Sequence, residues 1–230
     1  MDTTQARANI LRRIRSLQKR PGTAPTEAER AAVADYLQRH PSGPRQSLPA
    51  DLKQHFRTMA ERMASTVDEV PRIADAPAAA ARYLAAQGLP PVALAWPALD
   101  HLDWQAAGLD VQFRAPQRGP AGGADAVGIT GCFCALAETG TLVLLSGERT
   151  PASMHLLPET HVALLPASRI LADMEAAFAL LRAELGGAAA MMPRAVNMVS
   201  GPSRTGDIEQ TIVLGAHGPF RVHVIVAVDE

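Results

Sequence analysis

The feature that most constrains the fold is a series of short apolar runs separated by amphipathic segments. Helical periodicity falls at residues 51–66, 75–87 and 168–185. Strands that alternate with helices, in runs apolar enough to be buried on both faces, are typical of a sheet covered by helices. We therefore expect an α/β fold with an open sheet covered by helices. The expected strands are 67–70, 92–95, 109–113, 126–130, 141–145, 162–165, 196–199 and 220–228.

The first twenty residues differ in composition from this α/β region. They carry six basic side chains against one acid, Asp2, while Ile10, Leu11, Ile14 and Leu17 recur at helical spacing. The pattern predicts a basic amphipathic helix. Three interpretations stay open: a helix packed on a partner or on its own domain, a helix that binds an anionic surface, or a transit peptide.

A second helix is expected to follow a Pro/Gly break. Thr26 and Glu29 stand in capping-box register, and Pro41-Ser42-Gly43-Pro44 ends the helix near His40. We expect an N-terminal helical extension, residues 1–45, and an α/β domain, residues 46–230.

The composition limits the classes of function. The formal net charge is −1, so no global charge draws the chain to nucleic acid. No apolar run approaches the ~20 residues of a membrane span, and no secretory leader pattern is seen, so we expect a cytoplasmic protein. The two cysteines, Cys132 and Cys134, are expected to be reduced thiols, because their spacing suits no local disulfide and an iron–sulfur cluster typically takes four ligands.

Three polar segments bordered by apolar runs are candidates for chemistry. The longest is Ser200–Glu209, which we expect to enter a short helix at about 206–213. Ser203 and Thr205 would be its N-caps and Asp207 would lie in its first turn, or these residues would only finish the helix. Arg204 is unfavourable near a helix N-terminus unless an anion lies nearby, and that anion is Asp207, Glu209 or a substrate carboxylate.

The other two segments are Gly215–Pro219 and Glu138–Thr141. In the first, two glycines flank His217, which would orient a carboxyl group, act as an acid or base, or cap a turn carbonyl. In the second, Glu138 precedes a glycine-containing turn and a strand. It is either a surface carboxylate or a nucleophile, base or ion-pair partner.

In order and spacing these segments resemble the LUD-domain family, and within it the lactate utilization protein C branch. The resemblance extends from about Phe56 onward and also includes Gly128–Gly131 and Arg149 with the residues up to Pro158. It implies a fold related to those of CoA transferases and ribose-5-phosphate isomerases. It further implies a part in oxidising L-lactate to pyruvate beside two iron–sulfur partner proteins, with this chain binding or positioning a small carboxylate.

Carried onto this sequence, the resemblance implies three groups of site residues. Glu138 and His217 would be catalytic. The substrate-binding residues would be Arg149, Ser203, Arg204, Thr205 and Asp207. The residues that shape the backbone would be Thr139, Gly140, Thr141, Gly201, Pro202 and Gly218.

We expect no cofactor on this chain. It has no cluster-binding cysteine set, dinucleotide fingerprint or haem motif, so iron–sulfur clusters would sit on the partners. No metal site is expected at His155, Glu159 and His161, since Pro158 breaks any shared helix and no H-E-x-x-H is present.

Two other functions stay open. The chain could be a stand-alone enzyme of the CoA-transferase or sugar-phosphate isomerase type, with Glu138 as nucleophile or base. It could also be an assembly subunit without a ligand.

Overall fold

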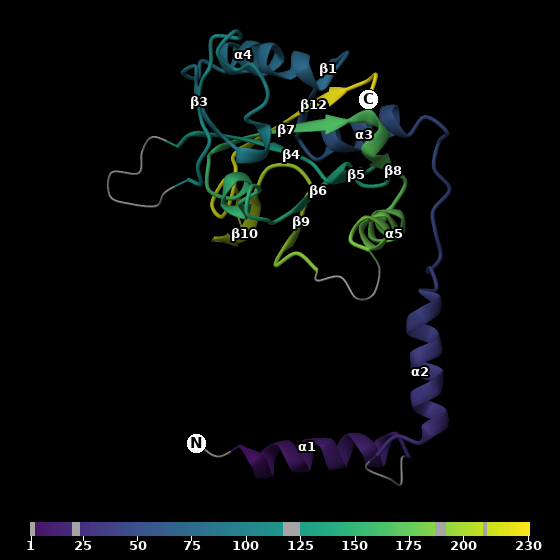
Figure 1. Ribbon diagram of the computed structural model, residues 1–230. Coiled ribbons are helices and arrows are strands. Elements are labelled where there is room, and N and C mark those ends of the chain that lie inside the picture. The colour runs from purple at the N-terminus through teal and green to yellow at the C-terminus, as the bar shows by residue number, and fades with distance from the viewer. Residues whose placement is uncertain (1–2, 20–23, 117–124, 187–191, 209–210) are drawn as a thin grey trace. The chain divides into compact units, whose positions relative to one another are not determined.

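The computed structural model describes residues 3–19, 24–116, 125–186, 192–208 and 211–230, without the side chains of 207–212 (Figure 1). The chain separates into two compact units, Met1–Arg45 and Gln46–Glu230. Among the described residues, no helix has the length and apolar character needed to cross a bilayer.

The first unit contains two helices, α1 (Thr4–Leu17) and α2 (Glu27–Arg39). The capping box predicted for the second helix is confirmed: the Thr26 hydroxyl accepts from the Glu29 amide at 3.2 Å, and the Thr26 amide donates to Glu29 Oε2 at 2.7 Å. Neither helix has a buried residue. Apart from the half-buried Leu11, the large apolar side chains of these two helices are exposed.

The second unit is built on a six-stranded sheet in the order β1-β12-β7-β4-β2-β3. All five pairings between neighbouring strands are parallel, as expected when helices cover a sheet. The predicted α/β fold is confirmed. The strands are β1 (Thr66–Val70), β2 (Val92–Ala95), β3 (Asp110–Gln112), β4 (Val127–Gly131), β7 (Thr160–Pro166) and β12 (Arg221–Ala227).

A second sheet of four strands has the order β8-β5-β6-β9. Two of its strands were expected: β6 (Thr141–Leu145) and β9 (Val196–Val199), which pair antiparallel. The other two, β5 (Cys134–Leu136) and β8 (Ile170–Leu171), are additions. Because β8 occupies the start of the predicted helix 168–185, helix α5 (Met174–Glu184) begins later, at an Asp173 N-cap.

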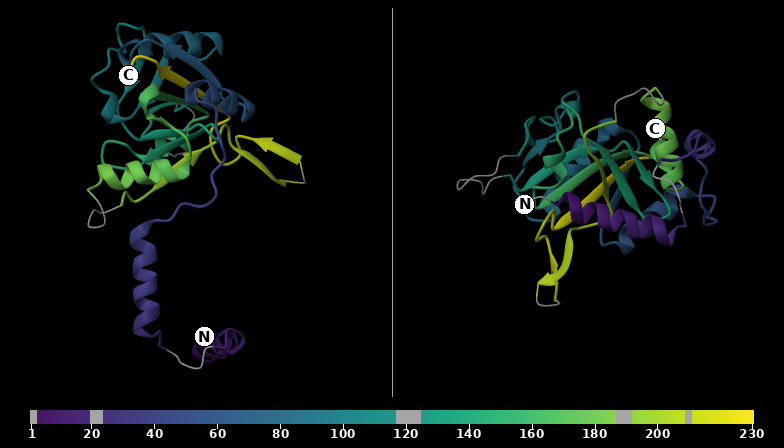
Figure 2. Two further views of the ribbon diagram at one scale, coloured as in Figure 1. Left: turned by 90° about the vertical axis from the view of Figure 1, so that its right-hand side faces the viewer. Right: turned by 90° about the horizontal axis from the view of Figure 1, so that it is seen from below.

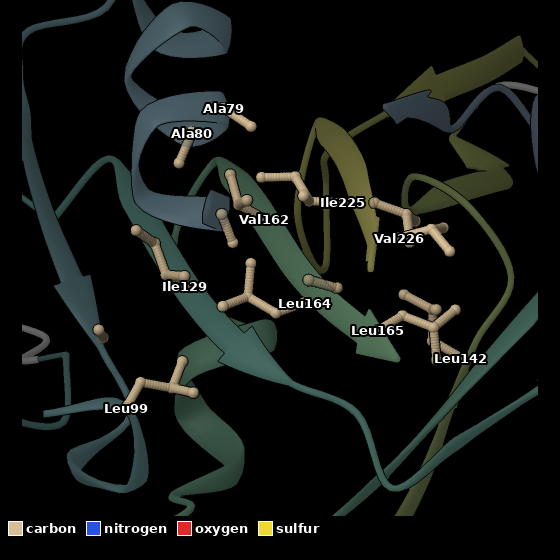
Figure 3. Close-up of a cluster of buried hydrophobic side chains, with 14 of the residues drawn as sticks. Ala79, Ala80, Leu99, Ile129, Leu142, Val162, Leu164, Leu165, Ile225 and Val226 are labelled. Atoms are coloured by element: carbon tan, nitrogen blue, oxygen red, sulfur yellow. The ribbon is translucent and has the colours of Figure 1, made fainter. Parts of the chain in front are cut away.

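The core lies on both faces of the six-stranded sheet, under helices α3 (Leu52–Arg62) and α4 (Ala76–Ala86) and against the second sheet. Figure 3 shows Ala79 and Ala80 of α4 close to Val162 on one face. On the other face, Leu142 of β6 lies beside Leu165 and Val226. Strand β12 is buried on both faces from Val222 to Ala227, because it lies in the middle of the sheet.

One predicted element is wrong. The residues expected to form a helix at 206–213 instead form an antiparallel hairpin, β10 (Arg204–Ile208) and β11 (Thr211–Leu214). Figure 2 shows this hairpin projecting from the two sheets. β-branched residues, including Thr205, Thr211 and Val213, favour strand over helix here.

Candidate functional site

Two glycines from separate polar segments pack against the C-terminal end of α3. Gly140 has φ +66°, and a Cβ there would lie 2.3 Å from the Ala60 amide nitrogen. Gly201 has φ +79°, and a Cβ there would lie 2.1 Å from the Met63 carbonyl oxygen. Both the backbone angle and the close approach require glycine at these positions. The segments that contain Glu138 and Ser203 therefore meet the same helix end.

Arg204 contacts the same helix end through its side chain. Its Nη2 donates to the Met63 carbonyl oxygen at 3.1 Å. The last carbonyls of a helix lack partners within the helix and carry partial negative charge, so a guanidinium there is favourable. The sequence placed Arg204 at a helix N-terminus. That placement is wrong, because the helix it required is a hairpin and Arg204 instead caps the end of α3.

Side-chain hydroxyls join the first two segments. Thr139 Oγ1 and Thr141 Oγ1 lie 2.7 Å apart, and Thr141 Oγ1 lies 2.7 Å from Ser200 Oγ. Thr141 is buried, so its hydroxyl needs these partners. The chain of hydroxyls holds the starts of two polar segments together where β6 and β9 meet.

The third segment joins at the base of the hairpin. The Ser203 amide donates to the Pro219 carbonyl at 2.9 Å, and the Ser203 carbonyl accepts from the Gly215 amide at 2.9 Å. A Cβ at Gly218 would lie 3.2 Å from Ser203 Cβ, so the two turns are in close contact. We call the assembly of Glu138–Thr141, Ser200–Thr205 and Gly215–Pro219 the motif cluster.

The two residues predicted to be catalytic lie on this cluster. Their side chains are not held by hydrogen bonds or ion pairs to the described residues. Glu138 is half-buried, and its amide donates to the Ala172 carbonyl at 3.0 Å. His217 is exposed beside Gly218. Within the described ranges, no hydrogen bond or ion pair engages either side chain, and none joins them to each other.

The predicted substrate-binding residues separate into two places. Ser203, Arg204 and Thr205 belong to the motif cluster, and Thr205 pairs with Val213 across the hairpin. Asp207 has its backbone in β10, while its side chain, like all of Glu209, lies outside the described part. Pro202 is buried beneath the same turn.

Arg149 has different neighbours. Its Nη2 donates to the Pro97 carbonyl and to Asp100 Oδ2, the latter at 2.6 Å, and its own carbonyl accepts from the Ala98 amide. These contacts anchor the 3₁₀ turn Pro97–Leu99. No contact between described residues links Arg149 to the motif cluster.

Three buried histidines lie elsewhere in the domain, and burial lowers the pKa of one of them, His223, to about 4. His155 and His161 have ring centroids 5.9 Å apart and exposures of 1% and 0%. Burial lowers the pKa of His155 to about 4 and that of His161 to about 3. His161 Nε2 lies 2.8 Å from Thr130 Oγ1, whereas both ring nitrogens of His155 lack a hydrogen-bond partner. The two rings are neutral near pH 7 and pack as core groups.

Cys132 and Cys134 are free thiols. Burial raises the pKa of both and brings that of Cys134 to about 11. Thiols of this kind are poor nucleophiles and poor ligands. Within the described ranges, no group of three or more His, Cys, Asp or Glu side chains is arranged to hold a metal ion.

Sequence reasoning did not predict the part played by Met59, Ala60 and Met63, which contact the cluster through their backbone. They are ordinary residues of an amphipathic helix, and only the three-dimensional packing brings them to Gly140 and Gly201. An unusually dense run of glycines is the one signal that close backbone packing occurs somewhere.

Comparison with known proteins gives a consistent picture. Residues 53–227 match the LUD domain family. The chain is 37% identical over 105 residues to lactate utilization protein C of Geobacillus kaustophilus, and 38% identical over 103 residues to that of Bacillus subtilis. Each match spans 45% of this chain and 42% of the relative.

A solved structure resembles the fold. The crystal structure of a DUF162 family protein from Deinococcus radiodurans matches with a TM-score of 0.58 and 24% sequence identity. The match covers 78% of this chain and 99% of that chain.

Proposed function

The chain belongs to the LUD domain family, and from this premise we propose that it serves in lactate utilization. More finely, it is a non-redox cytoplasmic subunit of a system that oxidises L-lactate to pyruvate, and it binds or positions the small carboxylate. The names of the relatives, lactate utilization protein C, support the first statement. The motif cluster supports the second.

The observation that carries the proposal is the meeting of the three polar segments at the end of α3. Arg204 uses Nη2 on the Met63 carbonyl, and a guanidinium has further N–H donors in a planar fork that suits a carboxylate. Glu138 and His217 lie on the other two segments of the motif cluster. A carboxylate held by Arg204 would thus lie at the cluster that also carries an acid and a base.

The chemistry of lactate divides between this chain and its partners. Oxidation of the C2 alcohol to a ketone releases two electrons and two protons. With two cysteines, the chain has too few thiolates for a typical cluster, so clusters on the two iron–sulfur partners would accept the two electrons. Glu138 and His217 take the two protons, one from the hydroxyl group and the other from C2.

A reconstituted system tests the proposal. L-lactate-dependent dye reduction is measured anaerobically for the two iron–sulfur proteins, with and without this chain. We expect the activity to require the chain, and Glu138→Gln or His217→Ala to lower it at least tenfold. Glu148→Gln, which changes an exposed loop carboxylate, is the matched control and should keep full activity.

Other outcomes point to the alternative functions. Unchanged activity without the chain would refute the role in lactate oxidation. Activity that needs the chain but survives loss of Glu138, Arg204 and His217 would indicate an assembly subunit without a ligand. Turnover of CoA esters or sugar phosphates by the isolated chain would instead favour a stand-alone enzyme of the CoA-transferase or isomerase type.

A further inference from the structure

Helix α1 carries an apolar stripe that is exposed in the structure. Ile10, Ile14 and Leu17 follow one another at spacings of four and three residues, which places them on one face of the helix. Their exposures are 60%, 43% and 76%, and no residue of α1 is buried. Within the described part of its own unit, this apolar face of the helix therefore has no cover.

The charged side chains of α1 are all basic, and they share the rest of its surface with neutral residues such as Gln5, Asn9 and Leu11. Between Thr4 and Leu17 it contains four arginines and no acidic residue. Arg12 and Arg15 lie opposite the apolar stripe. Arg7 and Arg13 lie closer to it, where long side chains can reach past apolar atoms to a charged surface. Lys19 follows directly after the helix.

This surface is separate from the family domain. The LUD domain match begins at residue 53, and α1 lies in the unit Met1–Arg45. The strands of the six-stranded sheet and the segments of the motif cluster all belong to the other unit, Gln46–Glu230. The basic and apolar faces of α1 thus lie outside the family domain.

We propose that α1 binds the surface of an anionic lipid bilayer, lying in the plane of the headgroups. An exposed apolar stripe on a helix whose polar face is basic is the arrangement that fits this surface, because apolar burial and attraction to anionic headgroups add together. A protein partner is the poorer fit. Protein interface cores are enriched in Tyr, Trp and Phe, and α1 has no aromatic residue.

The next helix of the same unit, α2, differs from α1 in its charges. Helix α2 exposes Val33, Tyr36 and Leu37, but its charges are mixed, and two of its three acids, Glu27 and Asp35, pair with neighbouring arginines. Charge complementarity to an anionic surface therefore distinguishes α1 from α2. Val33→Gln in α2 is the matched control for a change in the apolar stripe of α1.

Co-sedimentation of the full chain with vesicles tests the proposal. We expect binding to vesicles of mixed phosphatidylglycerol and phosphatidylcholine and none to phosphatidylcholine alone. Arg12→Gln, Arg13→Gln and Arg15→Gln combined should weaken binding about a hundredfold, since each basic residue near an anionic surface strengthens it about fivefold. Glutamine keeps the helix propensity, so a loss reports charge and not unfolding.

The apolar stripe and the salt dependence give independent readings. Ile10→Gln with Ile14→Gln should abolish binding, and Val33→Gln should leave it unchanged. Ionic strength of about 1 M, where the Debye length is about 3 Å, should release the chain.

Absence of binding to the phosphatidylglycerol vesicles, or full binding by the triple arginine variant, would overturn the proposal. Loss of assembly with the iron–sulfur proteins in α1 variants, without vesicle binding, would assign the helix to a protein partner instead.

Discussion

Replacing Gly201 by alanine tests the packing that builds the motif cluster. The change adds one methyl group to a turn that contacts the end of α3. Gly201 has φ +79°, and the new Cβ would lie 2.1 Å from the Met63 carbonyl oxygen. Separations under 3.0 Å are essentially never seen for real Cβ atoms, so the turn or the helix end must move.

Two effects lower the free energy of unfolding of the Gly201→Ala variant, and they add. A residue with a Cβ at positive φ loses about 1–2 kcal/mol relative to glycine. Forcing an extra methyl group into a packed site costs about 1–3 kcal/mol. We therefore expect the free energy of unfolding to fall by about 2–5 kcal/mol. For a domain of this size, that lowers Tm by roughly 5–15 °C.

Two control variants separate the costs. Gly88 has φ +65° with nothing within 4 Å of its added Cβ, so Gly88→Ala reports the backbone angle alone. Gly206 has neither a positive φ nor a neighbour within 4 Å, so Gly206→Ala should be close to neutral. Urea denaturation followed by circular dichroism ranks the three variants. If Gly201→Ala costs no more than Gly88→Ala, the close packing on Met63 is refuted.

Three further predictions concern other parts of the domain. Arg204→Met should lower the free energy of unfolding by about 1 kcal/mol, because the Met63 carbonyl loses its charged donor, and Arg204→Lys should recover part of it in urea denaturation. Full stability in Arg204→Met would show that the cap contributes nothing. Stability should also decline below pH 6.5, since unfolded histidines bind protons there while His155, His161 and His223 stay neutral down to about pH 4, 3 and 4. The loss reaches up to about 6 kcal/mol by pH 5, and unfolding midpoints that do not move between pH 7 and 5 would contradict it. Finally, with a pKa of about 11, Cys134 should react with an aromatic disulfide reagent only after denaturation, and rapid labelling of the native chain would argue against its burial.

The sequence predicted the sheet well where apolar runs are short and bounded by turns. The runs at 92–95 and 196–199 became strands with the same bounds. The local sequence is enough to specify these strands, because a short apolar run between turn residues is typical of a buried strand. The partners of each strand were not predicted, since pairing depends on residues far apart in the chain.

The hairpin and the motif contacts show where local reasoning fails. Residues that cap helices, such as Ser203 and Thr205, also suit turns and strands, and here the strand preference prevailed. The partner of Arg204 lies 141 residues away, at a backbone carbonyl that has no sequence signature. The neighbours of Arg149 were likewise set by tertiary packing.

The order of the central sheet has a consequence for synthesis. Strand β1 pairs only with β12, and the contact between Thr66 and His223 joins residues 157 positions apart. On the ribosome, β1 therefore emerges long before its neighbour and keeps an unpaired edge while most of the domain is made. Closing so long a loop is slow, and unpaired edges are sites of aggregation. The nascent chain would benefit from a chaperone that shields β1 until β12 fills the gap between β1 and β7.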